Sequence, residues 1–152
     1  MTDTYTDEEL AAILASHKLW LADDPAGDGK QADLSDATLT GATLTGADLR
    51  RATLTGADLS HATLTGANLR GVNLSDATLS HATLTGADLS HADLSDATLT
   101  GADLSHADLS HADLSGATLI DASLNRADLS HANLTGADLN HATLIGVITD
   151  TD

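Results

Sequence analysis

The side chains best able to do chemistry in this chain are histidine, serine and aspartate, which recur at multiples of five residues. Five histidines repeat at twenty-residue intervals in two series, one of His91, His111 and His131, the other of His61 and His81. Imidazole is the commonest side-chain ligand of transition metals, and a serine beside a base can become a nucleophile. Pairs such as Ser90-His91 occur throughout the chain, however, so adjacency alone does not define a catalytic pair. We therefore expect no enzyme.

Composition excludes several further classes of function. The 152 residues include 23 Asp and Glu but only 6 Lys and Arg, which gives a net charge of −17. Such a surface repels phosphates, so we expect neither direct nucleic-acid binding nor binding to anionic membranes. The absence of cysteine excludes disulfides, thiolate metal sites and cysteine nucleophiles. No secretion signal and no run long enough to cross a membrane is present, which predicts a cytoplasmic protein.

A five-residue period decides which elements must position these side chains. Leucine occupies every fifth position from Leu34 to Leu144, and alanine stands two residues before it, except at Val72. On an α-helix, five residues advance the face by about 140°, so the leucines would spiral around the surface. On a flat strand they would alternate between the two faces. A chain that turns a corner once per five residues instead points every leucine at one axis, and we predict such a solenoid.

Units such as Ala87-Asp88-Leu89-Ser90-His91 are arranged in tandem from Ala32 to Gly146, and this series resembles the pentapeptide-repeat family. The resemblance implies an all-β solenoid, a right-handed quadrilateral parallel β-helix with four pentapeptides per coil. Residues 30–148 would then form about six coils. Positions twenty apart would lie above one another at about 4.8 Å. The outward residues can therefore be grouped into columns.

Two of these columns suggest ligands of unusual kinds. Stacked His91, His111 and His131 could share a transition metal, but a flat ladder points its rings in parallel instead of at one ion. We interpret the histidines as solvated positions and expect no cofactor. A Thr-x-Thr ladder that starts at Thr43 and Thr45 is similar to the ice-binding faces of unrelated antifreeze proteins. Ice or metal binding is therefore a lesser alternative.

The acidic columns suggest a protein partner. One column holds four aspartates interrupted by Asn68, namely Asp48, Asp88, Asp108 and Asp128, and a second side receives Asp33, Asp93 and Asp113. The resemblance implies a precedent, because family members that bind DNA gyrase present an acidic rod similar to duplex DNA. Those members carry inward phenylalanines and a loop in the repeat, both absent here. We expect a protein-binding scaffold with an unidentified partner, and a DNA mimic that binds a topoisomerase as the alternative.

The amino-terminal residues 1–29 are predicted to form a capping helix and a connector. Thr6 and Glu9 have the spacing of a capping box. Five apolar residues then follow helical spacing: Leu10, Ile13, Leu14, Trp20 and Leu21. Pro25, Gly27 and Gly29 are expected to end the element. His17 lies between the apolar positions, and we interpret it as a packed structural residue.

The carboxyl-terminal end has no such cap. The repeat ends in Ile145-Gly146-Val147-Ile148, and a polar tail of residues 149–152 follows. Either the last coil frays, or Ile145, Val147 and Ile148 contact a second copy of the chain. Gyrase-binding members of the family pair end to end, and the resemblance therefore favours a homodimer through this coil.

Overall fold

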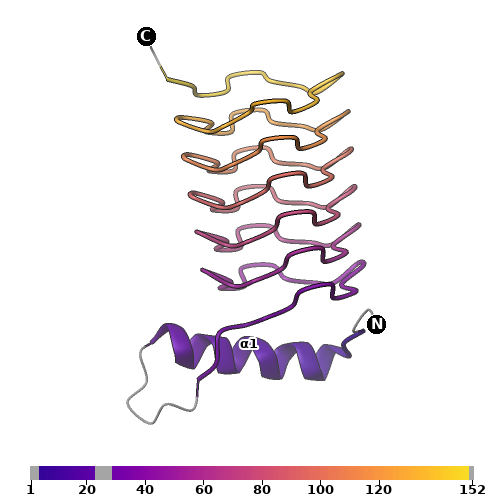
Figure 1. Ribbon diagram of the computed structural model, residues 1–152, viewed down its shortest axis with the longest axis vertical. Helices are drawn as coiled ribbons and strands as arrows, with labels where there is room; N and C mark the ends of the chain where they lie inside the picture. Colours follow the sequence, from indigo (N-terminus) through magenta and orange to yellow (C-terminus); the bar gives the residue numbers. More distant parts are fainter. Residues whose placement is uncertain (1–3, 23–28, 151–152) are drawn as a thin grey trace.

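The computed structural model of the chain describes residues 4–22 and 29–150 and shows a four-sided, right-handed parallel β-helix (Figure 1). Parallel bridges join Thr43 to Thr63 and Thr63 to Thr83, so one coil takes twenty residues. Each bridge is a single residue pair, because the chain turns before a longer strand can form. The coils stack along one axis, and a single helix, α1 (Asp7–Leu21), lies across one end. The fold predicted from the five-residue period is confirmed.

Each corner of the coil is a tight turn that requires a left-handed residue. The Ala87 amide donates to the Leu84 carbonyl at 3.0 Å, and Gly86, the second of the two central residues of this turn, has a φ of 65°. This is the pattern of a type II turn, in which a positive φ favours glycine and tolerates Asn, Asp or His. Every histidine of the chain except His17 occupies this corner position.

The core is a stack of leucine and alanine columns. Leu89 and Ala87 are buried, as are their counterparts in the coils above and below. The backbone binds each coil to both neighbours: the Leu89 amide donates to the Asp108 carbonyl at 2.7 Å, and the Asp88 amide donates to the Ala67 carbonyl at 3.0 Å. The stability of such a rod is a sum over repeats and their interfaces.

Helix α1 begins with the predicted capping box. The Glu9 amide donates to Thr6 Oγ1 at 3.2 Å, and the Thr6 amide donates to Glu9 Oε2 at 2.8 Å. Both bonds satisfy amides that the first helical turn would otherwise leave unpaired. The helix ends at Leu21, whereas Pro25 and Gly27, which were expected to end it, lie outside the described residues.

One side of α1 covers the first coil. Leu10 is buried against the leucine core, and Ile13 and Leu14 pack on it while remaining partly exposed. Trp20 and Leu21, the other two residues predicted for the cap, are also partly buried. No helix in the described part of the chain is long and apolar enough to cross a membrane.

No element covers the opposite end within the described residues (Figure 1). Exposure of the inward leucines rises there, from a buried Leu129 to a Leu144 that is 48% exposed. The chain nevertheless keeps its register, because the Ile148 amide donates to the Ala127 carbonyl at 2.9 Å. The carboxyl-terminal coil is therefore formed but uncovered.

Candidate functional site

The outward columns are the surfaces available for binding, and the structure assembles the predicted aspartate column. Parallel bridges run through Asp48, Asn68, Asp88, Asp108 and Asp128 in consecutive coils. These side chains are partly buried. Among the described residues, the same column ends at Ile148, which bridges to Asp128.

Each carboxylate of this column also has a structural task. Asp88 Oδ1 accepts hydrogen bonds from the Ser90 amide at 3.0 Å and from the Ser90 hydroxyl at 2.6 Å. Asp128 accepts the same pair of bonds from Ser130, and these bonds lower the pKa of Asp128. The backbone amide two residues after the aspartate lies in a turn and donates to no backbone carbonyl. The aspartate side chain accepts its hydrogen bond instead, which completes an Asx turn. This explains why Asp and Asn are frequent before the leucine.

The predicted mimic face is not uniformly acidic. Arg50 forms a two-bond ion pair with Asp48, in which Nε and Nη2 each lie 2.8 Å from a carboxylate oxygen. The hydrogen bond from Arg50 lowers the pKa of Asp48. Arg70 occupies the corresponding position one coil later, and Arg51 begins the adjoining corner column. Three of the chain's six basic residues therefore lie on this side.

A different side carries the denser negative charge. We call it the acidic face and define it by three outward and three corner aspartates: Asp33, Asp93, Asp113, Asp36, Asp76 and Asp96. The repeat units of this side contain no Lys or Arg. Hydrogen bonds from Ser35 and Ser115 lower the pKa of Asp33 and Asp113, respectively. The outward aspartates are predicted from the sequence, whereas the corner aspartates are not, although Asp76 and Asp96 show the twenty-residue spacing.

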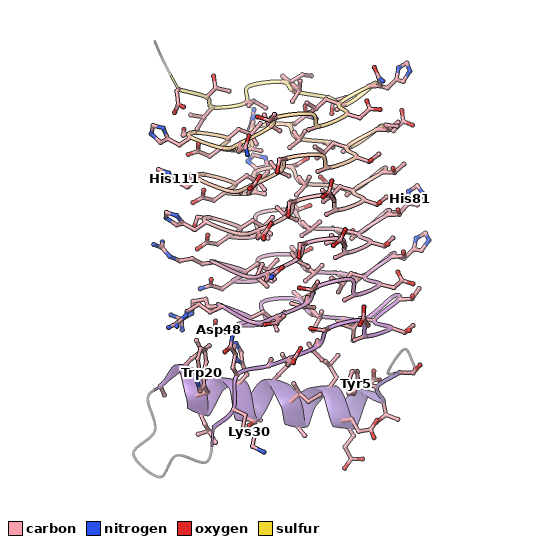
Figure 2. All side chains as sticks on the ribbon, in the orientation of Figure 1. Tyr5, Trp20, Lys30, Asp48, His81 and His111 are labelled. Carbon is pink, nitrogen blue, oxygen red and sulfur yellow. The ribbon has the colours of Figure 1, made fainter. Side chains whose placement is uncertain are left out.

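The histidine columns stack as the repeat predicts. The ring centroids of His91 and His111 lie 4.8 Å apart with an interplanar angle of 3°, and those of His111 and His131 lie 4.7 Å apart. His61 and His81 form a second stack at 5.2 Å, on another corner, and Figure 2 shows His81 and His111 projecting from different corners. Among residues 4–22 and 29–150, no three His, Asp or Glu side chains converge as metal ligands would.

The threonine ladder has the predicted length. Bridges connect Thr43, Thr63 and Thr83, and the next residue in the column is Asp103. The Thr85 hydroxyl donates to Asp103 Oδ2 at 2.9 Å, so one hydroxyl of the ladder's last rung is hydrogen-bonded within the fold. The flat threonine array is therefore three coils tall.

Together, the stacked coils and their outward columns define a repeat solenoid whose chemistry lies on its sides and ends. The family model for pentapeptide repeats matches residues 32–71, 73–110 and 112–148. The chain belongs to the pentapeptide-repeat family.

Three solved proteins illustrate this relationship. A pentapeptide repeat protein from the thylakoid lumen of Arabidopsis thaliana is 30% identical over 68% of each chain, with a TM-score of 0.52. HetL of Nostoc sp. strain PCC 7120, which is involved in heterocyst differentiation regulation, is 38% identical over 79% of this chain and 65% of its own, with a TM-score of 0.38. A further pentapeptide repeat protein of Nostoc PCC 7120 is 28% identical over 99% of both chains, with a TM-score of 0.49. Comparison with the curated proteins gives no match.

Proposed function

We propose that this chain is a non-catalytic scaffold whose acidic face binds a basic surface of a partner protein. The observation that carries the proposal is the gathering of six aspartates, without a single Lys or Arg, in the units of one side. Like charges gathered on one surface increase the magnitude of the local electrostatic potential, which steers a partner of opposite charge toward that surface. Parallel side chains on a convex rod do not enclose a substrate, which supports a binding role over a catalytic one.

The test replaces charge without disturbing the turns. In the triple variant Asp76→Asn, Asp93→Asn, Asp96→Asn, the amide oxygen keeps the acceptor that Ser95 uses, and asparagine tolerates a positive φ. The matched control, Asp88→Asn, Asp108→Asn, Asp128→Asn, removes three charges from another side. Quantitative affinity capture from cell extract should lose the partner with the first variant and keep it with the second. Equal capture by both variants would show that the acidic face is not the binding surface.

The alternative is a DNA mimic that binds a topoisomerase. It is supported by carboxylates that repeat at one-coil intervals along a rigid rod, such as Asp88, Asp108 and Asp128. Arg50, with its ion pair to Asp48, reduces the charge of that side. A supercoiling assay with purified DNA gyrase distinguishes the two roles. Inhibition that the charge-removing variants abolish would establish mimicry, and no inhibition at high protein concentration would exclude gyrase as the target.

We also propose that two copies pair through the uncovered carboxyl-terminal coil. The inward residues Leu134, Leu139 and Leu144 are partly or largely exposed there, and in the described part of the chain their amides donate no backbone hydrogen bond. An open edge of this kind invites pairing with another chain. Ile145 and Ile148 are 75% and 54% exposed but occupy outward positions, so the end surface consists mainly of the leucines and the partly buried Val147.

A further inference from the structure

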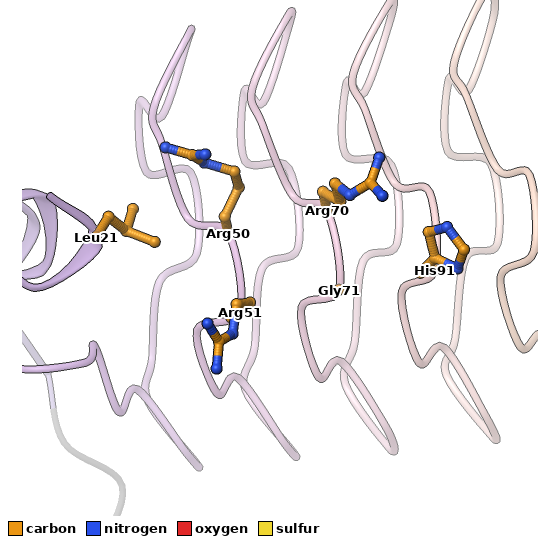
Figure 3. A pocket seen from close by; sticks show the side chains of 6 residues that line it. All are labelled: Leu21, Arg50, Arg51, Arg70, Gly71 and His91. Atoms are coloured by element: carbon orange, nitrogen blue, oxygen red, sulfur yellow. The ribbon is translucent and has the colours of Figure 1, made fainter. Parts of the chain in front are cut away.

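Half of the chain's basic residues surround one hollow on an otherwise acidic molecule. Arg50, Arg51 and Arg70 line it together with three further residues, Leu21, Gly71 and His91 (Figure 3). The hollow has a volume of about 440 Å³ and lies where the end of α1 meets the first coils. Ligand sites for small molecules commonly have volumes of this order.

A missing side chain creates the hollow. Arg51, Gly71 and His91 are successive members of one corner column. Above them the column is filled, because the rings of His91 and His111 stack at 4.8 Å. Gly71 leaves the position below His91 empty, and a Cβ there would meet only Arg51 Cγ, at 3.8 Å. Arg51 in turn lies with its guanidinium carbon 5.1 Å from the centroid of the Trp20 ring, which keeps its side chain at the helix side.

The charges of the three arginines are not equally satisfied. Arg50 is paired with Asp48 by two hydrogen bonds of 2.8 Å. Among the described residues, neither the guanidinium of Arg70 nor that of Arg51 has a hydrogen bond or an ion pair, and that of Arg51 makes a cation–π contact with the Trp20 ring. The chain has a net charge of −17, yet no carboxylate within residues 4–22 and 29–150 forms an ion pair with either of these two guanidinium groups.

We propose that this hollow binds a small phosphate ester, with the apolar part of the ligand against Leu21. The exposed side chains of Arg51 and Arg70 point apart in Figure 3, and they would turn so that both guanidinium groups hold the phosphate. A phosphate dianion matches two unpaired guanidinium groups, whose planar donors fit its oxygens. The partly buried Leu21 gives the hollow an apolar wall, which free phosphate would leave uncovered. The corner column of Arg51, Gly71 and His91 adjoins the acidic face, but none of that face's aspartates lines the hollow, so the site does not depend on the proposed function.

A titration with phenyl phosphate tests the site on the full chain, followed by ¹H–¹⁵N NMR at constant ionic strength. We expect saturable shifts at the amides of Arg51, Arg70 and Gly71 below about 10 mM, where a ligand with a dissociation constant of about 1 mM is nearly saturating. Inorganic phosphate should bind more weakly, because it cannot contact Leu21. The absence of shifts with phenyl phosphate would show that the hollow is not a binding site. Equal affinity for both probes would show that the ligand need not be an ester.

Two variants locate the binding, and each has a matched control. Arg70→Ser introduces the residue that the next coil carries at this position, Ser90, and should weaken phenyl phosphate binding about tenfold or more. Arg126→Gly removes one positive charge from a different corner column and should leave the affinity unchanged.

Gly71→His fills the hollow with a residue that the corner position accepts elsewhere, and it should abolish binding. Gly86→His makes the same change where nothing lies within 4 Å and should not affect the affinity. Unaltered affinity in both Arg70→Ser and Gly71→His would place the probe elsewhere and contradict the proposal.

Discussion

The Nδ1 atom of His17 accepts a hydrogen bond from the backbone amide of Ala32, at 3.0 Å. Later units satisfy the equivalent amide with a leucine carbonyl, as when Ala37 donates to Leu34 at 3.1 Å. Ala32 begins the first coil and has no leucine before it, so an imidazole of α1 takes the place of that carbonyl. The bond therefore joins the cap to the solenoid at the point where the repeat starts.

This bond fixes the charge state of His17. Its Nδ1 is the acceptor, so the proton of the neutral ring is on Nε2, which has no hydrogen-bond partner among the described residues. The ring is fully buried and stacks on Trp20 with the centroids 5.5 Å apart. Burial lowers the pKa of His17 below its ordinary value of 6.5, although the Arg50 backbone and the charge of Asp48 act in the opposite direction. The sequence-based interpretation of His17 as a packed structural residue agrees with this geometry.

The stability of the cap should therefore fall as the solution is acidified. Between the lowered folded pKa of His17 and the ordinary value of 6.5, the unfolded chain binds a proton that the folded chain does not, so the free energy of unfolding decreases as the pH falls through this range. In His17→Asn, the amide oxygen can accept from Ala32 without titrating. Thermal unfolding followed between about pH 7 and 5 should show a smaller pH dependence in this variant. An identical dependence in both proteins would contradict the assignment.

The Asx turns should contribute to stability one hydrogen bond at a time. Asp88→Ala removes the acceptor for the Ser90 amide, and we expect it to lower the free energy of unfolding by about 1 kcal/mol. Asp88→Asn retains the amide acceptor and should recover most of this loss. Urea unfolding of the three proteins provides the comparison, and equal losses in both variants would assign the effect to charge instead of to the turn.

The inward leucines should not tolerate charge. Leu89→Asp places an unpaired carboxylate in the fully buried column, and we expect the central coils to unfold because the core supplies no partner for it. His91→Asp is the matched control, since aspartate occupies the same corner position at Asp76 and Asp96. Circular dichroism should show loss of the β-rich signal in the first variant alone. Retention of that signal in Leu89→Asp would be incompatible with the fold.

Pairing through the carboxyl-terminal coil predicts a distinct pattern of masses. Light scattering of the unmodified chain should give about twice the 15.4 kDa of one copy. Leu144→Asp should give a monomer, because Leu144 belongs to the end surface, whereas Ile148→Asp changes a side column and should leave the dimer intact. A monomeric unmodified chain would rule out the end-to-end arrangement. If Ile148→Asp alone gave a monomer, the dimer interface would lie on the side column of Ile148 and not on the end surface.

The sequence predicts the fold well because one physical requirement repeats. A leucine at every fifth position has to face a common axis, and Leu34 through Leu129 do so. The capping box of Thr6 and Glu9 is equally local and was also predictable. The hollow beside Gly71 was not, because it depends on where α1 places Trp20 and on the direction that the Arg51 side chain consequently takes. The role of Asp88 in an Asx turn likewise depends on an amide that lacks a backbone acceptor.

At the left-handed corners, the backbone hydrogen bonds that hold the coils together do not depend on which side chain is exposed. The corner residue keeps its positive φ whether it is Gly86, His91 or Asp96, and its amide donates to the next coil in every case, at 2.9, 3.0 and 2.9 Å respectively. A substitution among these residue types therefore alters the surface chemistry at one rung and leaves the register of the coils intact. Each corner column can accumulate such changes independently of the other three. New recognition surfaces can thus evolve on this rod by single exchanges, without any revision of its core.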